Sequence, residues 1–162
     1  MFPDGTVEID EDAFVNCAIT SVSFPSSLKS ISMECFYECC SLKNVDFSKA
    51  TQLNAIYSLA FFECTSLTNV DLSSTAVSQI ASSAFEWSGL ESIHFAYDTN
   101  NIDNNAFSNC SSLSEITFDP YTGDQIFFQD FSIGYSAFLN ISPTGKVISA
   151  HPTVISSQNL LN

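Results

Sequence analysis

One stretch of sequence that occurs twice in succession decides the fold: residues 28–48 read LKSISMECFYECCSLKNVDFS, and residues 53–73 read LNAIYSLAFFECTSLTNVDLS. The two stretches share the first Leu, the Ile, the Phe with the Cys three residues after it, and the following Leu and Val, whereas most of the other residues differ. Self-similarity at a period of 20 to 50 residues is typical of proteins built from stacked repeats. The repeat therefore governs the interpretation of the rest of the chain.

The same pattern of columns extends along most of the chain. A Phe, preceded by Ala or Cys, recurs with steps of 22, 25, 24, 22 and 31 residues, at Phe14, Phe36, Phe61, Phe85, Phe107 and Phe138. An Ile stands five residues before each Phe, at Ile9, Ile31, Ile56, Ile80, Ile102 and Ile133. Four Phe residues are followed three positions later by Cys, at Cys17, Cys39, Cys64 and Cys110, and Ser88 takes this place in the fourth unit. Agreement in so many columns makes chance a poor explanation.

The end of each unit has the alternation of a half-buried strand. In the second unit, Val45 and Phe47 alternate with Asp46, and Leu42 adds another apolar position before them. One such strand cannot cover its apolar side alone, but strands stacked in register about 4.8 Å apart merge their apolar columns into one core. The sequence therefore predicts a solenoid, α/β or mainly β, of about six stacked units of 22–25 residues. We expect a parallel β-sheet on one face and the Phe column inside.

Composition excludes several classes of partner. The 162 residues include 18 Asp and Glu but 4 Lys and Arg, which gives a formal net charge of -14. This charge repels phosphate backbones and anionic lipid surfaces, so we expect no nucleic-acid partner. No run approaches the roughly 18 apolar residues that cross a bilayer, so we expect no membrane insertion of this segment.

The quoted units resemble the BspA-like leucine-rich repeats, which read approximately aliphatic-x-x-Ile-x-x-x-Ala-Phe-x-x-Cys-x-x-Leu-x-x-aliphatic-x-aliphatic. The resemblance covers about residues 5–118, and Trp87-Ser88 departs from it where Cys is usual. It implies a leucine-rich repeat solenoid. Members are typically extracellular or cell-surface proteins of bacteria and mucosal protist parasites, and some are implicated in attachment to host matrix proteins or other cells. The resemblance thus implies a non-enzymatic, protein-binding or adhesive module.

The units and the turn residues predict one leucine-rich repeat domain over residues 1–162. Regular repeats occupy 5–118, a turn-rich insertion loop occupies 119–136, and an atypical capping unit with a polar tail occupies 137–162. Lys146-Val147-Ile148 fits one last strand. The chain is either the C-terminal part of a longer array or a complete small protein.

The cysteines are interpreted as structural thiols. Four of them share one repeat column, where a small side chain packs at a turn. Neighbouring units lie close enough for a disulfide, but Ser88 interrupts the column, and stacked side chains point the same way. Cys39-Cys40 lacks the spacing of zinc and redox sites, so we expect no metal.

Catalytic motifs are missing as well. The chain has two histidines, His94 and His151, and none of the common nucleophile, zinc-protease or phosphate-loop motifs, so we expect neither an enzyme nor a cofactor. His94 belongs to an outward column in which stacking sets Asp46 beside Asp71 and Asp71 beside His94. The simplest interpretation is a solvated face on which Asp71 pairs with His94. A metal-dependent hydrolase centred on Asp46, Asp71 and His94 is the alternative from a different class.

The outward columns also predict a binding surface, because a rigid sheet face with short polar side chains suits an extended protein partner. The residues of this predicted surface are Lys43, Asn44, Asp46, Thr68, Asn69, Asp71, Glu91, Ser92, His94, Glu115 and Thr117. We expect a monomer that binds a protein ligand, such as a host matrix or cell-surface protein, at the cell surface or outside the cell. The alternative function is an intracellular, cytoplasmic scaffold that uses the same face. The simplest interpretation is a polar, solvated face that binds nothing.

Overall fold

The computed structural model describes residues 2–119, 132–142 and 146–149, and in these residues the chain forms twelve short strands and no helix. Six strands lie on one side of the coil: β1 (Glu8–Ile9), β3 (Ser30–Ile31), β5 (Ala55–Ile56), β7 (Gln79–Ile80), β9 (Asn101–Ile102) and β11 (Ser132–Ile133). Six lie on the other side: β2 (Ser21–Ser23), β4 (Asn44–Asp46), β6 (Asn69–Asp71), β8 (Ser92–Phe95), β10 (Glu115–Phe118) and β12 (Lys146–Ser149). Each unit contributes one strand to each side, so the fold is mainly β.

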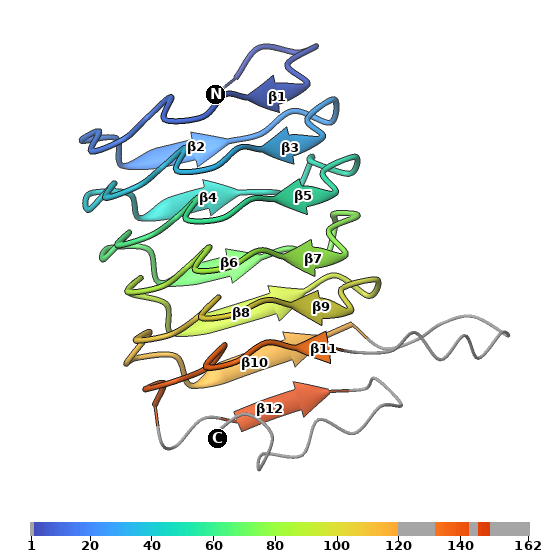
Figure 1. Cartoon of the computed structure of the whole chain (residues 1–162). Coiled ribbons are helices and arrows are strands. Elements are labelled where there is room, and N and C mark those ends of the chain that lie inside the picture. Colours follow the sequence, from blue (N-terminus) through green and yellow to red (C-terminus); the bar gives the residue numbers. More distant parts are fainter. Residues whose placement is uncertain (1, 120–131, 143–145, 150–162) are drawn as a thin grey trace, which may run out of the picture.

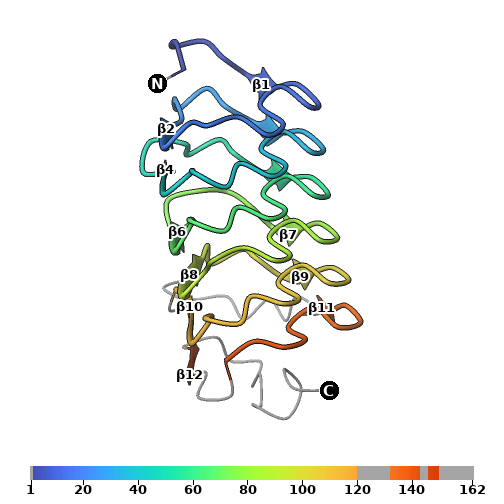
Figure 2. The same ribbon diagram turned by 90° about the vertical axis from the view of Figure 1, so that its left-hand side faces the viewer.

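The strands stack in parallel into a solenoid, as predicted (Figure 1). Register sets like residues over like: Ile9 pairs with Ile31, and Ile93 pairs with Ile116. The odd-numbered strands form one continuous six-stranded sheet, which the sequence pattern did not predict. Figure 2 shows this sheet and the row of even-numbered strands on opposite sides of the coil. The even-numbered row is divided into a two-stranded sheet, β2-β4, and a four-stranded sheet, β12-β10-β8-β6.

The column of Phe residues forms a stack of parallel rings between the two rows of strands. The ring centroids of Phe36 and Phe61 are 5.1 Å apart with planes 8° from parallel, and those of Phe61 and Phe85 are 5.1 Å apart at 5°. Rings inside the stack are fully buried, which confirms the predicted core. The first ring, Phe14, is half-buried and meets Phe2 in an edge-on contact at a centroid distance of 5.7 Å.

The arm that carries the Phe column is held by its own coil-to-coil hydrogen bonds. The backbone N–H of Phe36 donates to the carbonyl of Ala60 at 2.8 Å, and the N–H of Glu38 donates to the carbonyl of Phe62 at 2.8 Å. Two residues in every unit adopt a positive φ, two positions before and two positions after the column Phe. Most residue types adopt this left-handed conformation at a cost, and Asn and Asp tolerate it best. Leu59 and Trp87 are the bulkiest residues in this conformation.

Three of the four cysteines of the column lie in the core, as predicted, whereas Cys17 of the first unit is half-buried. Cys39, Cys64 and Cys110 are buried, and their thiols donate to carbonyl oxygens of earlier units at 3.0 to 3.2 Å. Ser88 replaces Cys in the same place, with its Oγ 3.2 Å from the sulfur of Cys110. Burial raises the pKa of the Cys110 thiol to about 11, so this side chain stays protonated at neutral pH.

The predicted insertion and capping segments are partly described. Residues 120–131, 143–145 and 150–162 lie outside the described residues. Within the predicted loop 119–136, β11 pairs with β9 and continues the Ile column through Ile133. The last strand expected at Lys146-Val147-Ile148 forms as β12 and pairs with β10. The stack therefore resumes after the insertion earlier than the predicted loop boundary.

Candidate interaction surface

The predicted surface residues lie together on or beside strands β4, β6, β8 and β10, and none of them is buried. Seven are exposed and four are half-buried, the latter being Thr68, Ser92, His94 and Thr117. Register sets Asp71 beside His94 and His94 beside Thr117. The structure therefore confirms the placement of these side chains on one face, while their role in binding stays a prediction.

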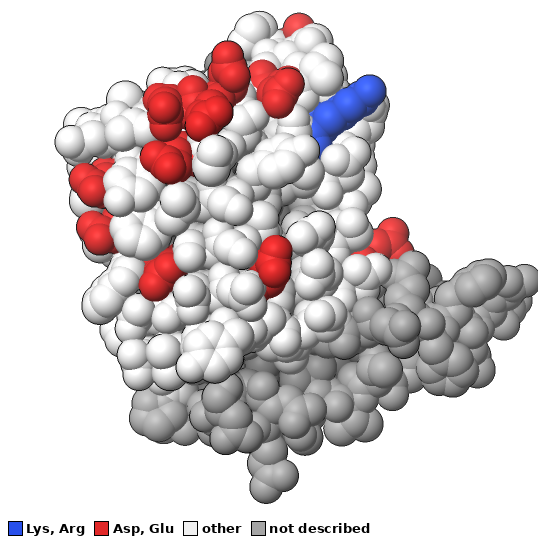
Figure 3. Space-filling model, viewed as in Figure 1, with Lys and Arg blue, Asp and Glu red and all other residues white. Residues whose placement is uncertain are grey.

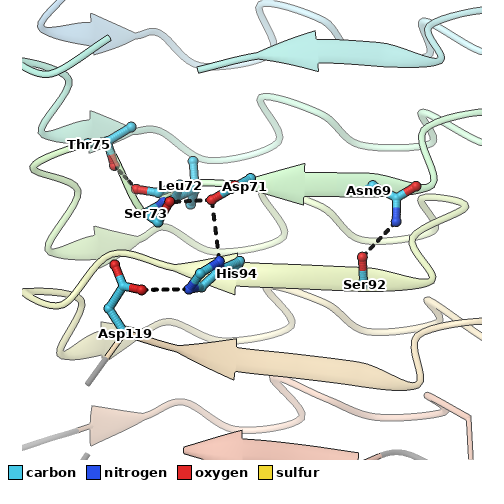
Figure 4. Close-up of polar contacts among 8 residues, drawn as sticks. All are labelled: Asn69, Asp71, Leu72, Ser73, Thr75, Ser92, His94 and Asp119. Atoms are coloured by element: carbon cyan, nitrogen blue, oxygen red, sulfur yellow. Dashed lines mark hydrogen bonds and ion pairs between the residues drawn. The ribbon is translucent and has the colours of Figure 1, made fainter. Parts of the chain in front are cut away.

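His94 is at the centre of a polar cluster on this face (Figure 4). Its Nδ1 lies 3.5 Å from Oδ1 of Asp71, and its Nε2 lies 2.8 Å from Oδ1 of Asp119. The predicted contact between Asp71 and His94 is thus confirmed, but the shorter contact is to Asp119, which lies within the predicted loop 119–136. Strand alternation was the signal that could have found it. Asp119 follows Thr117 by two residues and so lies on the same face as this partner of His94.

Each aspartate of this column is fixed by the serine two residues after it. The backbone N–H of Ser73 donates to Oδ1 of Asp71 at 2.9 Å, and the N–H of Ser48 donates to Oδ1 of Asp46 at 2.9 Å. Partial burial on its own raises the pKa of Asp71, but the hydroxyl and N–H of Ser73 and the nearby His94 together hold this pKa below its ordinary value. The hydroxyl and N–H of Ser48 lower the pKa of Asp46. Both aspartates are therefore ionised at neutral pH.

A second polar contact links the same two strands. The side-chain amide of Asn69 on β6 donates to the hydroxyl of Ser92 on β8 at 2.6 Å, at the other end of the strands from Asp71 and His94 (Figure 4). Cross-strand pairs of this kind add stability to a sheet. Side-chain contacts therefore join β6 and β8 at both ends.

Strands β4 and β6 do not pair, which differs from the continuous sheet that the sequence predicts. At other steps of this row an N–H before one strand donates to the preceding unit: Lys43 donates to Thr20 at 2.9 Å, and Glu91 donates to Thr68 at 2.7 Å. In this described part of the chain, the equivalent bond from Thr68 to Lys43 is missing. A closed ladder would bring the carboxylates of Asp46 and Asp71 directly opposite each other, and like charges in that position destabilise a sheet.

The surface offers little for metal chemistry. Among the residues that the structure describes, no three His, Cys, Asp or Glu side chains lie close enough together to hold a metal ion. Asp71 and His94 are in contact, but the interruption separates Asp46 from them in the ladder. The alternative of a metal-dependent hydrolase centred on these three residues therefore gains no support from the geometry.

The repeated coil has a counterpart among known protein families. The family model of the BspA type leucine-rich repeat region matches in six copies, over residues 1–114 and 49–158. The chain belongs to this family. Because leucine-rich repeat proteins of this family are typically non-enzymatic binding modules, the family is consistent with a protein-interaction module.

Solved structures of leucine-rich repeat proteins are similar to this chain. One, from Bacteroides ovatus, is 23% identical with a TM-score of 0.59, over 68% of this chain and 28% of that protein, and it shows the fold alone. The chain thus spans less than a third of the length of that protein. Another, from T. pallidum, is 26% identical with a TM-score of 0.49, over 72% of this chain and 69% of that one. No curated protein matches the chain.

Membrane-spanning helices are not found in the part of the chain that the structure describes, where no helix has the length and apolar character to cross a bilayer.

Proposed function

We propose that this BspA type leucine-rich repeat chain is a protein-binding, adhesive module of a cell-surface or extracellular protein, and that it meets its partner through the face of β4, β6, β8 and β10. The observation that carries the proposal is the gathering of eleven exposed or half-buried polar side chains on one face of stacked strands. Repeat proteins commonly bind extended partners through such surfaces.

Rigidity of the face supports this function. The contacts of His94 with Asp71 and Asp119, and the bond between Asn69 and Ser92, order side chains before any partner arrives. Ordered side chains lose less conformational entropy on association, so more of the contact free energy remains as affinity. A face whose polar side chains are already ordered therefore binds a protein partner more tightly than a face with mobile side chains does.

Charge favours a basic partner. The surface carries four carboxylates, those of Asp46, Asp71, Glu91 and Glu115, and a single lysine, Lys43. On the opposite face of the solenoid, which carries the odd-numbered strands, acidic side chains gather mainly over the first units (Figure 3). Both faces therefore contribute a negative field that speeds association with basic proteins and weakens as salt is added.

Binding to purified extracellular-matrix proteins tests the proposal. We expect saturable binding of at least one of them, weaker at high salt, and lost in the variant Asp46→Asn, Asp71→Asn, His94→Gln. The Asn residues retain the oxygen that accepts from Ser48 and Ser73, so the fold is preserved. A matched control, Glu11→Gln with Asp98→Asn, removes two exposed charges elsewhere and should bind normally. Equal loss in both variants would contradict a role for this face.

Cellular location is tested separately, by labelling intact cells that express the parent protein with a reagent that does not cross membranes. We expect the repeat region to be labelled. Labelling only after lysis would contradict the surface assignment and favour the intracellular scaffold that uses the same face.

A further inference from the structure

A hollow of about 330 Å³ opens on a part of the molecule separate from the sheet face. It lies along the edge where the chain passes from the odd-numbered into the even-numbered strands, on the left in Figure 1, at the turns before β6, β8 and β10. Its lining includes Thr65, Trp87, Gly89, Asn109, Ser111 and Asn140. Its volume lies at the lower end of the range of about 300 to 1,000 Å³ for small-molecule sites.

The hollow coincides with a shortened turn in the fourth unit. Leu90 follows the column Phe by five residues, whereas the equivalent Leu67 and Leu113 of the flanking units follow theirs by six. Glycine occupies the shortened turn because a Cβ on Gly89 would lie 2.2 Å from the carbonyl oxygen of Thr65. The turn of the fourth unit is therefore recessed between those of its neighbours.

Trp87 lies beside this recess in an unfavourable backbone conformation. It is the only tryptophan of the chain, it is 52% exposed, and its φ is 59°. Units one, five and six carry Asn at this position, at Asn16, Asn109 and Asn140, which suits a positive φ. The positive φ itself belongs to the repeat, because every unit has it at this position, but the fourth unit places a bulky aromatic side chain there at a conformational cost. Because half of this ring is exposed, packing in the core does not account for its presence.

Among the residues that the structure describes, no charged side chain lines the hollow, although the chain has 18 acidic residues. The polar groups that line it are side-chain amides and hydroxyls, and the amide of Asn140 donates to Oδ1 of Asn109 at 2.8 Å. These groups both donate and accept hydrogen bonds, as a ligand rich in hydroxyl groups requires. An uncharged lining favours an uncharged ligand.

The backbone around the hollow is already used by the solenoid. The N–H of Trp87 donates to the carbonyl of Ser108 at 3.0 Å, and the N–H of Asn109 donates to the carbonyl of Leu139 at 2.7 Å. Binding of an extended peptide as an added strand requires an unpaired edge, so the coil-to-coil bonds disfavour that mode here.

We propose that this hollow binds a neutral carbohydrate, with the apolar C–H face of one pyranose ring packed against Trp87 and its hydroxyl groups bonded to the Asn and Ser side chains. An aromatic ring supplies a rigid apolar platform, and amides and hydroxyls supply orientation. This sugar site is independent of the proposed protein-binding face, because the two share no residue.

Fluorescence of the single tryptophan reports directly on this site. Lactose, maltose, cellobiose and diacetylchitobiose are titrated into the intact chain up to tens of millimolar, with sialyllactose as a charged comparison. We expect a saturable change in Trp87 emission with at least one neutral sugar and weaker binding of the sialylated one. Absence of a saturable change with all four neutral sugars would overturn the proposal.

Two variants and one control locate the binding by calorimetry or ligand-observed NMR, with the sugar that binds. Trp87→Asn removes the ring and introduces the residue that other units carry, so the fold should be retained or stabilised, while the affinity should fall at least tenfold. Asn140→Ala should also weaken binding. Tyr57→Asn removes another exposed aromatic side chain, 50% exposed, and should bind like the unaltered protein. Unchanged affinity of Trp87→Asn would overturn the proposal.

Discussion

Two neighbouring junctions of the even-numbered row, β6–β8 and β4–β6, are built from similar sequences and differ in structure. At β6–β8 the strands pair in register, Asp71 faces His94, and Asn69 bonds to Ser92. At β4–β6 the equivalent residues are Asp46 against Asp71 and Asn44 against Asn69, and the strands do not pair. The two junctions thus differ in the residues that face each other on the surface, and we expect repulsion between Asp46 and Asp71 to oppose pairing of β4 with β6.

The core is continuous across both junctions. The Phe rings on either side of the interruption, Phe36 and Phe61, stack at 5.1 Å, the same distance as Phe61 and Phe85 beside the intact junction. Strands β3, β5 and β7 also pair continuously across both junctions. The stack is therefore held by the Phe column and the odd-numbered sheet, which leaves the other face able to vary its charges.

Truncation of a core ring should have the largest effect on the free energy of unfolding. The loss should be equal at the two junctions. Phe61→Ala and Phe85→Ala each remove a fully buried ring, so we expect a loss of about 3 to 5 kcal/mol in the free energy of unfolding. Phe14→Ala should lose less, because this ring is half-buried. Urea denaturation of the three variants measures these losses. A loss below about 1 kcal/mol at Phe61 alone would mean that the core is interrupted together with the sheet.

Removal of the Asp71–His94 contact should weaken the intact junction moderately. We expect a coupling between Asp71→Asn and His94→Gln of about 0.2 to 1 kcal/mol in a double-mutant cycle, because both side chains are partly exposed. Coupling of the same size between Asp46→Asn and Asp71→Asn, with the same sign, would contradict the distinction between the junctions.

Removal of the like charge should strengthen the interrupted junction slightly. Asp46→Asn keeps the oxygen that accepts from Ser48 and removes the repulsion that opposes pairing of β4 with β6. The neutral amide accepts from Ser48 more weakly than the carboxylate does, so closure of the ladder should leave a net gain of only a few tenths of a kcal/mol, at the low end of cross-strand pair energies. Thermal unfolding measures the change, and Glu11→Gln is the control for loss of one exposed carboxylate. A destabilised Asp46→Asn variant would contradict the role of repulsion.

Acidification should have the smallest effect on the free energy of unfolding. The pKa values of Asp46 and Asp71 lie below their ordinary values in the folded chain, so their contribution is complete above the unfolded pKa, about 3.9, and is lost as pH falls through the folded values. Solvent screens both exposed groups, so the loss should be small. Chemical denaturation between pH 5 and pH 2 measures this loss. The difference between the unaltered chain and the double variant Asp46→Asn, Asp71→Asn gives the contribution of the two aspartates. Identical pH profiles would contradict the contribution.

The sequence alone was sufficient to predict the stack of coils, because each unit must bury the same apolar columns against its neighbours. Ile9 over Ile31 and Phe36 over Phe61 follow from the repeat alone, and so do the outward positions of Asp71 and His94. The interruption could not be predicted, because it depends on a balance between backbone pairing and repulsion that the apolar pattern does not contain. Asp119 was missed because it follows the end of a strand. The shorter turn at Gly89 is visible in the sequence, but the first unit has the same spacing from Phe14 to Ile19, so turn length alone could not predict the hollow.

Amide hydrogen exchange measured by NMR tests the central claim most directly, namely that a continuous core carries an interrupted sheet. The amides of Phe36 and Phe61 donate to Ala60 and Ala84 at 2.8 Å, and that of Glu91 donates to Thr68, so we expect all three to be strongly protected. The amide of Thr68, at the interrupted junction, should exchange orders of magnitude faster. Protection of Thr68 equal to that of Glu91, or fast exchange of Phe61, would contradict the account.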